Sequence, residues 1–396
     1  METTVQALFQ AHFEAYAETP ALPLPVKKAG WALMACRTAE LGGHIQACPE
    51  GHVEGVWYNS CKHRCCPQCN QIQMERWLDF QKARLLAGPH RHLIFTLPHE
   101  LNALWQWNGT VMSDLLFQAV RETVMELSGD ERYVGALPGF VCALHTWGRS
   151  LALHPHVHCL ITEGGLDEAG HWQAPRKGCF LPARVVMALF RGKYLAALEQ
   201  AWEAGEWRLP AGETPPRLRN LLNKLGRKKW NVRVGERYAH GEGVATYLAR
   251  YVKGGPLKNS QLQAVTETTV TFRYYPHPDT ADDGQRHAVD LTLSPEEFIR
   301  RYLQHVPEPG RQRVRSYGLY AHGKGVQLAI ARAQWQQAPV VRPAFLDWQT
   351  YYERVTGQRE ATHCPVCGRR LVVRGAVARR PRDPPARPGF RYREAA

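Results

Sequence analysis

The chain has 396 residues, with 50 lysines and arginines against 36 aspartates and glutamates, which gives a formal net charge of +14. Its 44% hydrophobic and 10% aromatic residues can form a sizeable core, which excludes an intrinsically disordered protein. No run approaches the roughly 18 consecutive apolar residues of a membrane span, and no signal-peptide pattern is visible. We therefore expect a cytoplasmic protein of two or three domains with no membrane contact and a polyanionic partner.

Helices and strands are predicted in an irregular order along the chain. We expect a helix and a loop over residues 1–30, a cysteine-rich segment over 31–70 and a helix over 71–86. Further helices are predicted at 111–128, 183–204, 243–252 and 295–305. Strands are predicted at 92–97, 140–146, 157–162, 230–234, 270–275 and 287–293. This order favours an α+β fold around an antiparallel sheet. The absence of a P-loop motif argues against a nucleotide cofactor.

Six of the eleven cysteines lie in one turn-rich segment over residues 36–69. In a chain without a secretory signal, such clustering indicates metal ligands rather than disulfides. A Cys-x-x-Cys pair and a nearby Cys–His pair can share one tetrahedral ion. We therefore predict a structural Zn²⁺ whose first-choice ligands are Cys48, His52, Cys66 and Cys69. Cys36 and Cys61 could exchange into this site or belong to a second one.

The other cysteines lie far from this segment. Cys364-Pro-Val-Cys367 is a half-site, which either docks on the N-terminal module to complete a metal site or is vestigial. Cys142, Cys159 and Cys179 lie in apolar or mixed surroundings, so we predict that they are core residues.

Alternating histidines mark a second candidate metal site. His154, His156 and His158 share one face of a strand, because strand side chains alternate with a period of two. A strand just upstream carries His145, and antiparallel pairing would bring it opposite the others. Adjacent neutral imidazoles bind divalent ions. We predict a catalytic divalent-metal site at His145, His156 and His158, with His154 as the rival third ligand.

Tyr247 and Tyr251 are four residues apart in a segment whose composition favours a helix, so they would share one helical face. In isolation, such a pair is more often core packing. In a basic chain with a His-x-His motif, it indicates candidate nucleophiles that attack a phosphate polarised by a metal.

Basic residues gather over 215–237, in the tyrosine segment and in an arginine-rich tail over 369–393. We expect them to bind DNA phosphates, with Trp230 as a stacking surface beside them. The predicted contacts are Arg217, Arg219, Lys224, Arg227, Lys228, Lys229, Arg250 and Lys253.

Taken in this order, the motifs resemble two-tyrosine HUH endonucleases, specifically the rolling-circle insertion-sequence transposases of the IS91 type. The resemblance covers roughly residues 30–370. Besides the cysteine, histidine and tyrosine motifs, it includes FTLPHEL at 95–101, EEFIRRYLQHV at 296–306 and RSYGLYAHG at 315–323. It implies an HUH endonuclease domain, with a central antiparallel sheet flanked by helices, joined to an N-terminal zinc-binding domain.

The resemblance also implies a reaction. Tyr247 or Tyr251 would attack single-stranded DNA with the help of Mg²⁺ or Mn²⁺, leaving a 5′-phosphotyrosine and a free 3′-hydroxyl. The partners would be the single-stranded ends of a mobile element and its target DNA, in a prokaryotic nucleoid. Two alternatives are a plasmid replication initiator or relaxase with the same chemistry, and a non-catalytic zinc-dependent DNA-binding regulator.

The predicted domain organisation follows from these motifs. We expect an N-terminal helix and linker over 1–30 and a zinc-binding domain with its following helix over 31–86. The nuclease domain is expected over 87–325. A C-terminal segment over 326–396 carries the cysteine half-site and the basic tail.

Overall fold

The computed structural model describes residues 2–19, 22–176, 180–239, 255–276 and 287–380. At its centre is a five-stranded sheet in the order β12-β4-β5-β3-β8, with every neighbouring pair antiparallel. The strands are β12 (Val314–Gly318), β4 (Gly139–Trp147), β5 (Leu153–Thr162), β3 (His90–Thr96) and β8 (Val232–Tyr238). The predicted α+β fold with a central antiparallel sheet is confirmed. The predicted helix over 243–252 lies outside the described residues.

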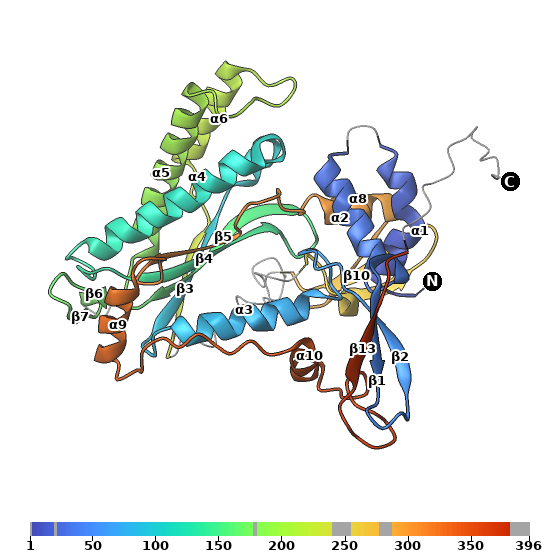
Figure 1. The fold of residues 1–396 in the computed structure, drawn as a ribbon. Coiled ribbons are helices and arrows are strands. Elements are labelled where there is room, and N and C mark those ends of the chain that lie inside the picture. The colour runs from blue at the N-terminus through green and yellow to red at the C-terminus, as the bar shows by residue number, and fades with distance from the viewer. Residues whose placement is uncertain (1, 20–21, 177–179, 240–254, 277–286, 381–396) are drawn as a thin grey trace.

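Two helices, α4 (Asn102–Gly129) and α5 (Ala183–Glu203), cover one face of this sheet, as Figure 1 shows. A third helix, α6 (Pro215–Arg227), packs on α5 and adds Leu218 and Leu225 to the same core. Alternate residues of the sheet, among them Phe95, Val157 and Cys159, are fully buried against these helices. Because strand side chains alternate, the residues between them point to the opposite face.

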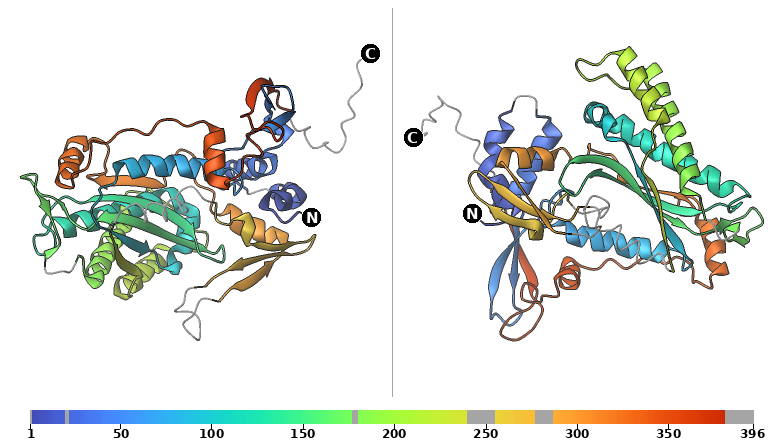
Figure 2. Two further views of the ribbon diagram at one scale, coloured as in Figure 1. Left: turned by 90° about the horizontal axis from the view of Figure 1, so that it is seen from below. Right: turned by 180° about the vertical axis from the view of Figure 1, so that it is seen from behind.

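Among the described residues, helices cover the opposite face at one end only. There α3 (Asn70–Arg84) and α9 (Gly325–Gln334) enclose a smaller core that contains Leu78, Leu160 and Leu328. Figure 1 and Figure 2 show α3 running along the side of the sheet that α4 and α5 leave open. The alternating histidines lie on this same face.

The N-terminal helices form a separate core with a distant part of the chain. α1 (Val5–Ala17) and α2 (Leu24–Ala35) pack against α8 (Pro295–Leu303) and a small sheet. The strands of that sheet, in spatial order, are β11 (Val289–Leu293), β10 (Val270–Tyr274) and β9 (Leu262–Val265). α8 and this small sheet were predicted to belong to the nuclease domain, yet they share a core with the N-terminal helices α1 and α2. The domain boundaries themselves stay a prediction.

α2 forms where a proline-rich loop was predicted. Pro23 is its N-cap and a further proline stands in its first turn. Proline is tolerated there because the first amides of a helix have no intrahelical partner. The same reasoning explains α6, which begins with two prolines and buries Leu218 and Leu225 from an otherwise basic sequence.

The two ends of the chain meet in a third sheet, in the order β13-β1-β2. Its strands are β1 (Gly43–Ala47), β2 (Glu54–Tyr58) and β13 (Val372–Val377). Before β13, α10 (Trp348–Thr356) packs on α3, where Arg354 pairs with Asp79 at 2.7 Å. The remaining short elements of the described residues are β6 (Gly165–Leu166), β7 (Trp172–Gln173) and three 3₁₀ turns at Ala39–Leu41, His99–Leu101 and Asn259–Gln261. Among the described helices, none is long and apolar enough to span a membrane.

A buried hydrogen-bond chain runs through His90, at the end of β3. The Leu86 amide donates to Tyr320 Oη at 3.0 Å, and that hydroxyl lies 2.8 Å from His90 Nε2. On its other side, His90 Nδ1 lies 2.8 Å from the carbonyl oxygen of Gly88 and donates to it. Nε2 must therefore accept, as only a neutral imidazole can. Burial lowers the pKa of His90 to about 4.

Acid is expected to destabilise the fold through His90. The unfolded chain binds a proton at this residue near its ordinary pKa of 6.5, whereas the folded chain does so only near a pKa of about 4. The neutral His90 therefore contributes about 3 kcal/mol to the free energy of unfolding. This contribution is complete above about pH 6.5 and is lost as the pH falls through about 4. Urea unfolding at both ends of this range tests it. If the H90Q variant loses as much free energy of unfolding as the wild type over this pH range, other groups cause the acid sensitivity.

Candidate functional site

The three predicted metal-binding histidines meet on the open face of the central sheet. β4 and β5 pair with His145 directly opposite His156, and the strand period puts His158 on the same face. One ring nitrogen from each lies within 4.8 Å of the others. The predicted strand pairing is thus confirmed. His154 lies outside this group, with its ring centroid 5.0 Å from that of His156.

Hydrogen bonds orient two of these rings. Nδ1 of His156 lies 2.6 Å from the carbonyl oxygen of His154 and donates to it, which leaves Nε2 as the ligand atom. Nδ1 of His158 lies 2.8 Å from Nε2 of His92 on β3. The Nε2 atoms of His156 and His158 are 3.1 Å apart. Adjacent ligands of an octahedral ion with bonds of about 2.1 Å are about 3 Å apart. The donor set therefore fits a divalent ion.

Burial keeps these imidazoles neutral. It lowers the pKa of His156 and of His92 to about 4. It also holds the pKa of His145 and of His158 well below the ordinary value. Neutral imidazole is the form that binds a metal ion. The cluster is thus ready to bind an ion at neutral pH without losing protons.

Two arginines place positive charge near opposite sides of the cluster. After burial, the Arg233 guanidinium further lowers the pKa of His92, and Arg313 does the same for His145. Arg233 lies on β8 at one edge of the sheet, whereas Arg313 directly precedes β12 at the other. The surroundings of the cluster therefore favour an anionic ligand such as a phosphate.

His92 is a candidate site residue that sequence analysis missed. The run His90-Arg91-His92 has the same two-residue period as the predicted ligands, and β3 pairs with β5. That period was the available signal. The period alone cannot distinguish His92 from His90, because both side chains point to the same face of the sheet. The contacts distinguish them: His90 bonds to Tyr320, whereas His92 bonds to His158.

The predicted nucleophiles Tyr247 and Tyr251, with Arg250 and Lys253, lie outside the described residues. The chain directly after them is held tightly. A Cβ atom on Gly255 would lie 2.6 Å from the carbonyl oxygen of Cys65 and 3.0 Å from Tyr302 Oη. Only glycine fits such a close approach. Gly255 therefore packs directly against the cysteine-rich loop.

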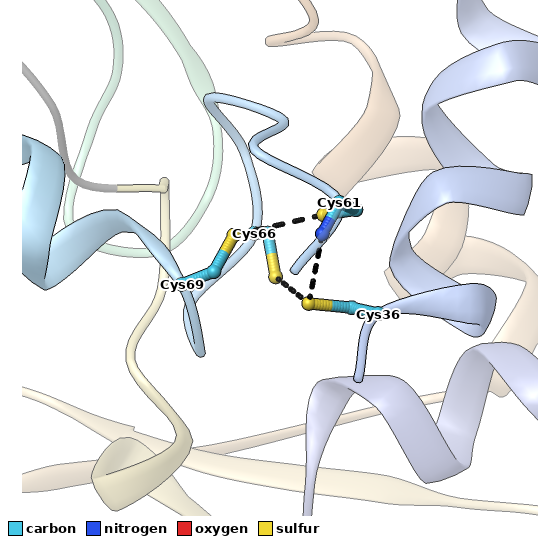
Figure 3. Close-up of side chains that lie close together, drawn as sticks. All are labelled: Cys36, Cys61, Cys66 and Cys69. Atoms are coloured by element: carbon cyan, nitrogen blue, oxygen red, sulfur yellow. Dashed lines mark hydrogen bonds between the residues drawn. The ribbon is translucent and has the colours of Figure 1, made fainter. Parts of the chain in front are cut away.

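Figure 3 shows Cys36, at the end of α2, converging with three cysteines of that loop: Cys61, Cys66 and Cys69. Their sulfurs are 3.5 Å apart for Cys36–Cys66 and 3.6 Å apart for Cys61–Cys69. A tetrahedral ion with Zn–S bonds of about 2.3 Å separates its ligands by about 3.8 Å. The Cys61 amide also donates to Cys36 Sγ at 3.5 Å, which favours the thiolate form.

The first-choice grouping of zinc ligands was wrong. Cys48 and His52 do not meet Cys66 and Cys69. They lie instead with the C-terminal pair, Cys364 and Cys367. The physical reason is the β1–β2 hairpin, which carries Cys48 and His52 to its far end, away from the loop before α3 (Figure 1). The C-terminal half-site therefore docks on the N-terminal module, as one of the two alternatives predicted.

Cys142 and Cys159 are confirmed as core residues. They lie opposite each other on β4 and β5, and both are fully buried. Cys179 lies outside the described residues. Cys65 also stands apart from both cysteine clusters, and burial raises the pKa of its thiol to about 11.

The predicted basic run forms an exposed cationic face on and after α6. Its predicted DNA contacts are all solvent-exposed: Arg217, Arg219, Lys224, Arg227, Lys228 and Lys229. Lys228 is paired with Glu100 at 2.6 Å. The predicted stacking role of Trp230 was wrong. Its ring is 2% exposed, because it packs edge-on against Phe190 and donates from Nε1 to a backbone carbonyl of α6.

Comparisons with known proteins match two parts of the chain to transposase families. Residues 139–327 match a family model described as "Putative transposase", and residues 8–97 match one described as "Transposase zinc-binding domain". A "Putative transposase y4qJ" from Sinorhizobium fredii is 35% identical over 375 residues, which covers 92% of each chain. The "Transposase for insertion sequence element IS801" from Pseudomonas savastanoi pv. phaseolicola is 30% identical over 87% of this chain and 82% of its own. No solved structure matches.

The antiparallel sheet, the cysteine cluster and these matches define a transposase with an N-terminal zinc-binding domain that carries a structural Zn²⁺. DNA is therefore its partner. The chain belongs to the IS91 family of insertion-sequence transposases, as the motifs had indicated.

Proposed function

We propose that this transposase cuts and rejoins single-stranded DNA through 5′-phosphotyrosine intermediates, which drives rolling-circle transposition of an insertion sequence. The observation that carries the proposal is the buried, neutral imidazole cluster of His145, His156 and His158, with arginines near both sides. The imidazoles would bind a divalent ion, and the arginines would favour a phosphate beside that ion. DNA as substrate implies a cytoplasmic, nucleoid-associated location.

In this reaction Tyr247 or Tyr251 supplies the attacking oxygen. Its hydroxyl loses a proton and forms a bond to the scissile phosphorus, while the neighbouring nucleotide leaves with a free 3′-hydroxyl. One phosphodiester bond replaces another, so rejoining needs no ATP. Two tyrosines allow two successive covalent links, one to the donor strand and one to the target strand.

His145, His156 and His158 would hold the divalent ion, Mg²⁺ or Mn²⁺. When bound, the ion supplies Lewis acidity to the scissile phosphate. The protein keeps the imidazoles neutral by burial, and His92 fixes the ring of His158 by its hydrogen bond. Imidazole suits transition-metal ions, whereas Mg²⁺ prefers oxygen ligands. Mn²⁺ is therefore the first ion to use in assays.

We also propose Cys36, Cys61, Cys66 and Cys69 as the ligands of the zinc-binding domain. Their loop shares a core with Phe9 of α1 and with α8, where Tyr302 donates a hydrogen bond to the Cys65 carbonyl at 2.5 Å. Because Gly255 rests on the same carbonyl, the zinc loop braces the chain next to the tyrosines.

Covalent trapping tests the proposed chemistry. The full chain is incubated with Mn²⁺ and labelled single-stranded oligonucleotides from the ends of the element, and the products are separated under denaturing conditions. We expect a protein–DNA adduct that requires the metal ion. The adduct should disappear in the double variant Tyr247→Phe, Tyr251→Phe, which should still bind the oligonucleotide. Adducts that persist in this variant would overturn the tyrosine assignment.

The alternatives give different products. Transfer of the labelled strand into a second DNA molecule supports a transposase reaction, whereas nicking and resealing without transfer supports a replication initiator or relaxase. No adduct on any end sequence, with duplex preferred over single strands, supports a non-catalytic regulator.

Removing charge from α6 is expected to weaken DNA binding and flatten its salt dependence. The quadruple glutamine variant replaces Arg217, Arg219, Lys224 and Arg227. Because each single-stranded phosphate contact contributes about 0.7 to the slope of log K against log salt, up to about 3 should be lost. Titrations at several salt concentrations measure it. R132Q is the matched control, since that exposed arginine lies outside the basic run and pairs with Asp130. An unchanged slope in the quadruple variant would show that these charges are merely solvated.

A further inference from the structure

Four potential ligands from opposite ends of the chain meet at one end of the β13-β1-β2 sheet. Cys48 directly follows β1 and His52 lies in the turn before β2. Cys364 and Cys367 lie in the turn that precedes β13. β1 is the central strand, and Ala47 pairs with Glu54 on one side and Val372 on the other. Both turns therefore emerge at the same end of the sheet.

The donor atoms have the spacing of a tetrahedral zinc site. Cys48 Sγ lies 3.5 Å from Cys367 Sγ and 3.6 Å from His52 Nδ1. Cys364 Sγ lies 3.9 Å from the same ring nitrogen. With Zn–S bonds of about 2.3 Å and Zn–N bonds of about 2.0 Å, a tetrahedron separates two sulfurs by about 3.8 Å and sulfur from nitrogen by about 3.5 Å.

Backbone hydrogen bonds shape both turns before any ion binds. The Cys48 amide donates to the Val53 carbonyl at 2.8 Å, and the Cys364 amide donates to the Arg369 carbonyl at 2.8 Å. Each turn contains a glycine with positive φ, Gly51 at 78° and Gly368 at 69°. The two turns thus present their ligands from fixed backbone positions, which lowers the entropy cost of binding.

Neither a disulfide nor simple burial explains the cluster. The sulfurs of Cys48 and Cys367 are 3.5 Å apart, well beyond the about 2.05 Å of a disulfide bond. A disulfide would also leave the approach of His52 and Cys364 without a reason. Packing in a hydrophobic core does not explain why the four side chains meet, because valines of this sheet are largely exposed. Val56, Val372 and Val373 are 49%, 43% and 58% exposed.

We propose that Cys48, His52, Cys364 and Cys367 bind a second structural Zn²⁺, which fastens the C-terminal segment to the zinc-binding domain. Two of its ligands lie outside the residues matched by the zinc-binding family model, which end at 97. The proposal does not depend on the proposed DNA chemistry. A small three-stranded sheet with little apolar cover is marginally stable, and a structural zinc ion adds stability.

The bound ion would hold the chain from Phe345 to β13 against α3 and the β1–β2 hairpin. That segment makes a series of aromatic contacts with the N-terminal half of the chain. The Arg76 guanidinium on α3 lies over Phe345 and Tyr351, and Trp348 stacks on Trp57 of β2 at 4.9 Å. The zinc site lies at the end of this segment, so its loss should free the segment from that end.

Zinc stoichiometry tests the proposal. Native mass spectrometry of the full chain is performed in the His156→Ala background, so that the histidine cluster does not contribute a further ion. We expect two zinc ions per chain. The added pair Cys364→Ser, Cys367→Ser should leave one ion. Val366→Ala, at an exposed residue between the two C-terminal cysteines, should keep two. One ion in the background protein, or two after removal of the C-terminal cysteines, would overturn the proposal.

Limited proteolysis supplies a second readout. A chelator should expose the segment between α10 and β13 to cleavage, and the C-terminal double serine variant should be cleaved there without chelator. Replacing Cys367 by histidine, which retains a zinc ligand, should restore both the second ion and the resistance. Equal cleavage of the wild type, with and without zinc, would show that no ion fastens this segment.

Discussion

Replacing His156 by alanine should reduce the rate of DNA cleavage by about 10³-fold or more, while the affinity for single-stranded DNA stays close to that of the wild type. Metal polarisation of a phosphate contributes several kcal/mol to transition-state stabilisation, and each 1.36 kcal/mol is about tenfold in rate. His156 is buried in the cluster, whereas the exposed cationic face that we expect to bind DNA lies on and after α6. Binding and cleavage should therefore separate in this variant.

Single-turnover cleavage at saturating Mn²⁺, beside equilibrium binding, measures the two effects. His171→Ala is the matched control, because that histidine is exposed in a distant turn. His92→Ala should give an intermediate result: metal affinity falls by about 10–100-fold, and excess Mn²⁺ restores the rate. Cleavage by His156→Ala at the wild-type rate would remove the histidine cluster from the mechanism.

Replacing Cys66 by serine should cost the zinc-binding domain its folded structure. A structural zinc site contributes about 10–16 kcal/mol, which is comparable to the whole free energy of unfolding of a typical domain, about 5–15 kcal/mol. The cysteine loop shares its core with Phe9, Phe298 and Tyr302, so α1 and α8 should lose their packing together. Because Gly255 rests against this loop, we also expect cleavage to be lost.

Thermal unfolding and zinc content provide the measurements. Cys65→Ser is the matched control: it lies beside Cys66 and is equally buried, yet it belongs to neither cluster. It should retain zinc and a melting temperature near that of the wild type. Full retention of zinc and stability by Cys66→Ser would exclude this residue as a ligand.

Local patterns in the sequence predicted much of the architecture. Strands β3, β4 and β5 and helices α5 and α8 follow the predicted segments closely, because alternation and helical spacing act over a few residues. The same locality explains the misses. β1, β2 and β13 are strands of only five or six residues, and their pairing joins residues 43–47 to 372–377. No local pattern encodes such a partner.

The sequence by itself determined that the chain has a zinc-binding module, that His156 and His158 share a strand face, and that the motifs are those of the IS91 family. Each depends on residue type and short spacing. Only the tertiary structure decided which cysteines meet, that Trp230 is buried, and that His92 contacts His158. The physical reason is that strand pairing between distant parts of the chain decides which residues meet. Cys36 and Cys48 are twelve residues apart, yet strand β1 carries them to different clusters, while Cys48 meets Cys367 across 319 positions because β1 pairs with β13.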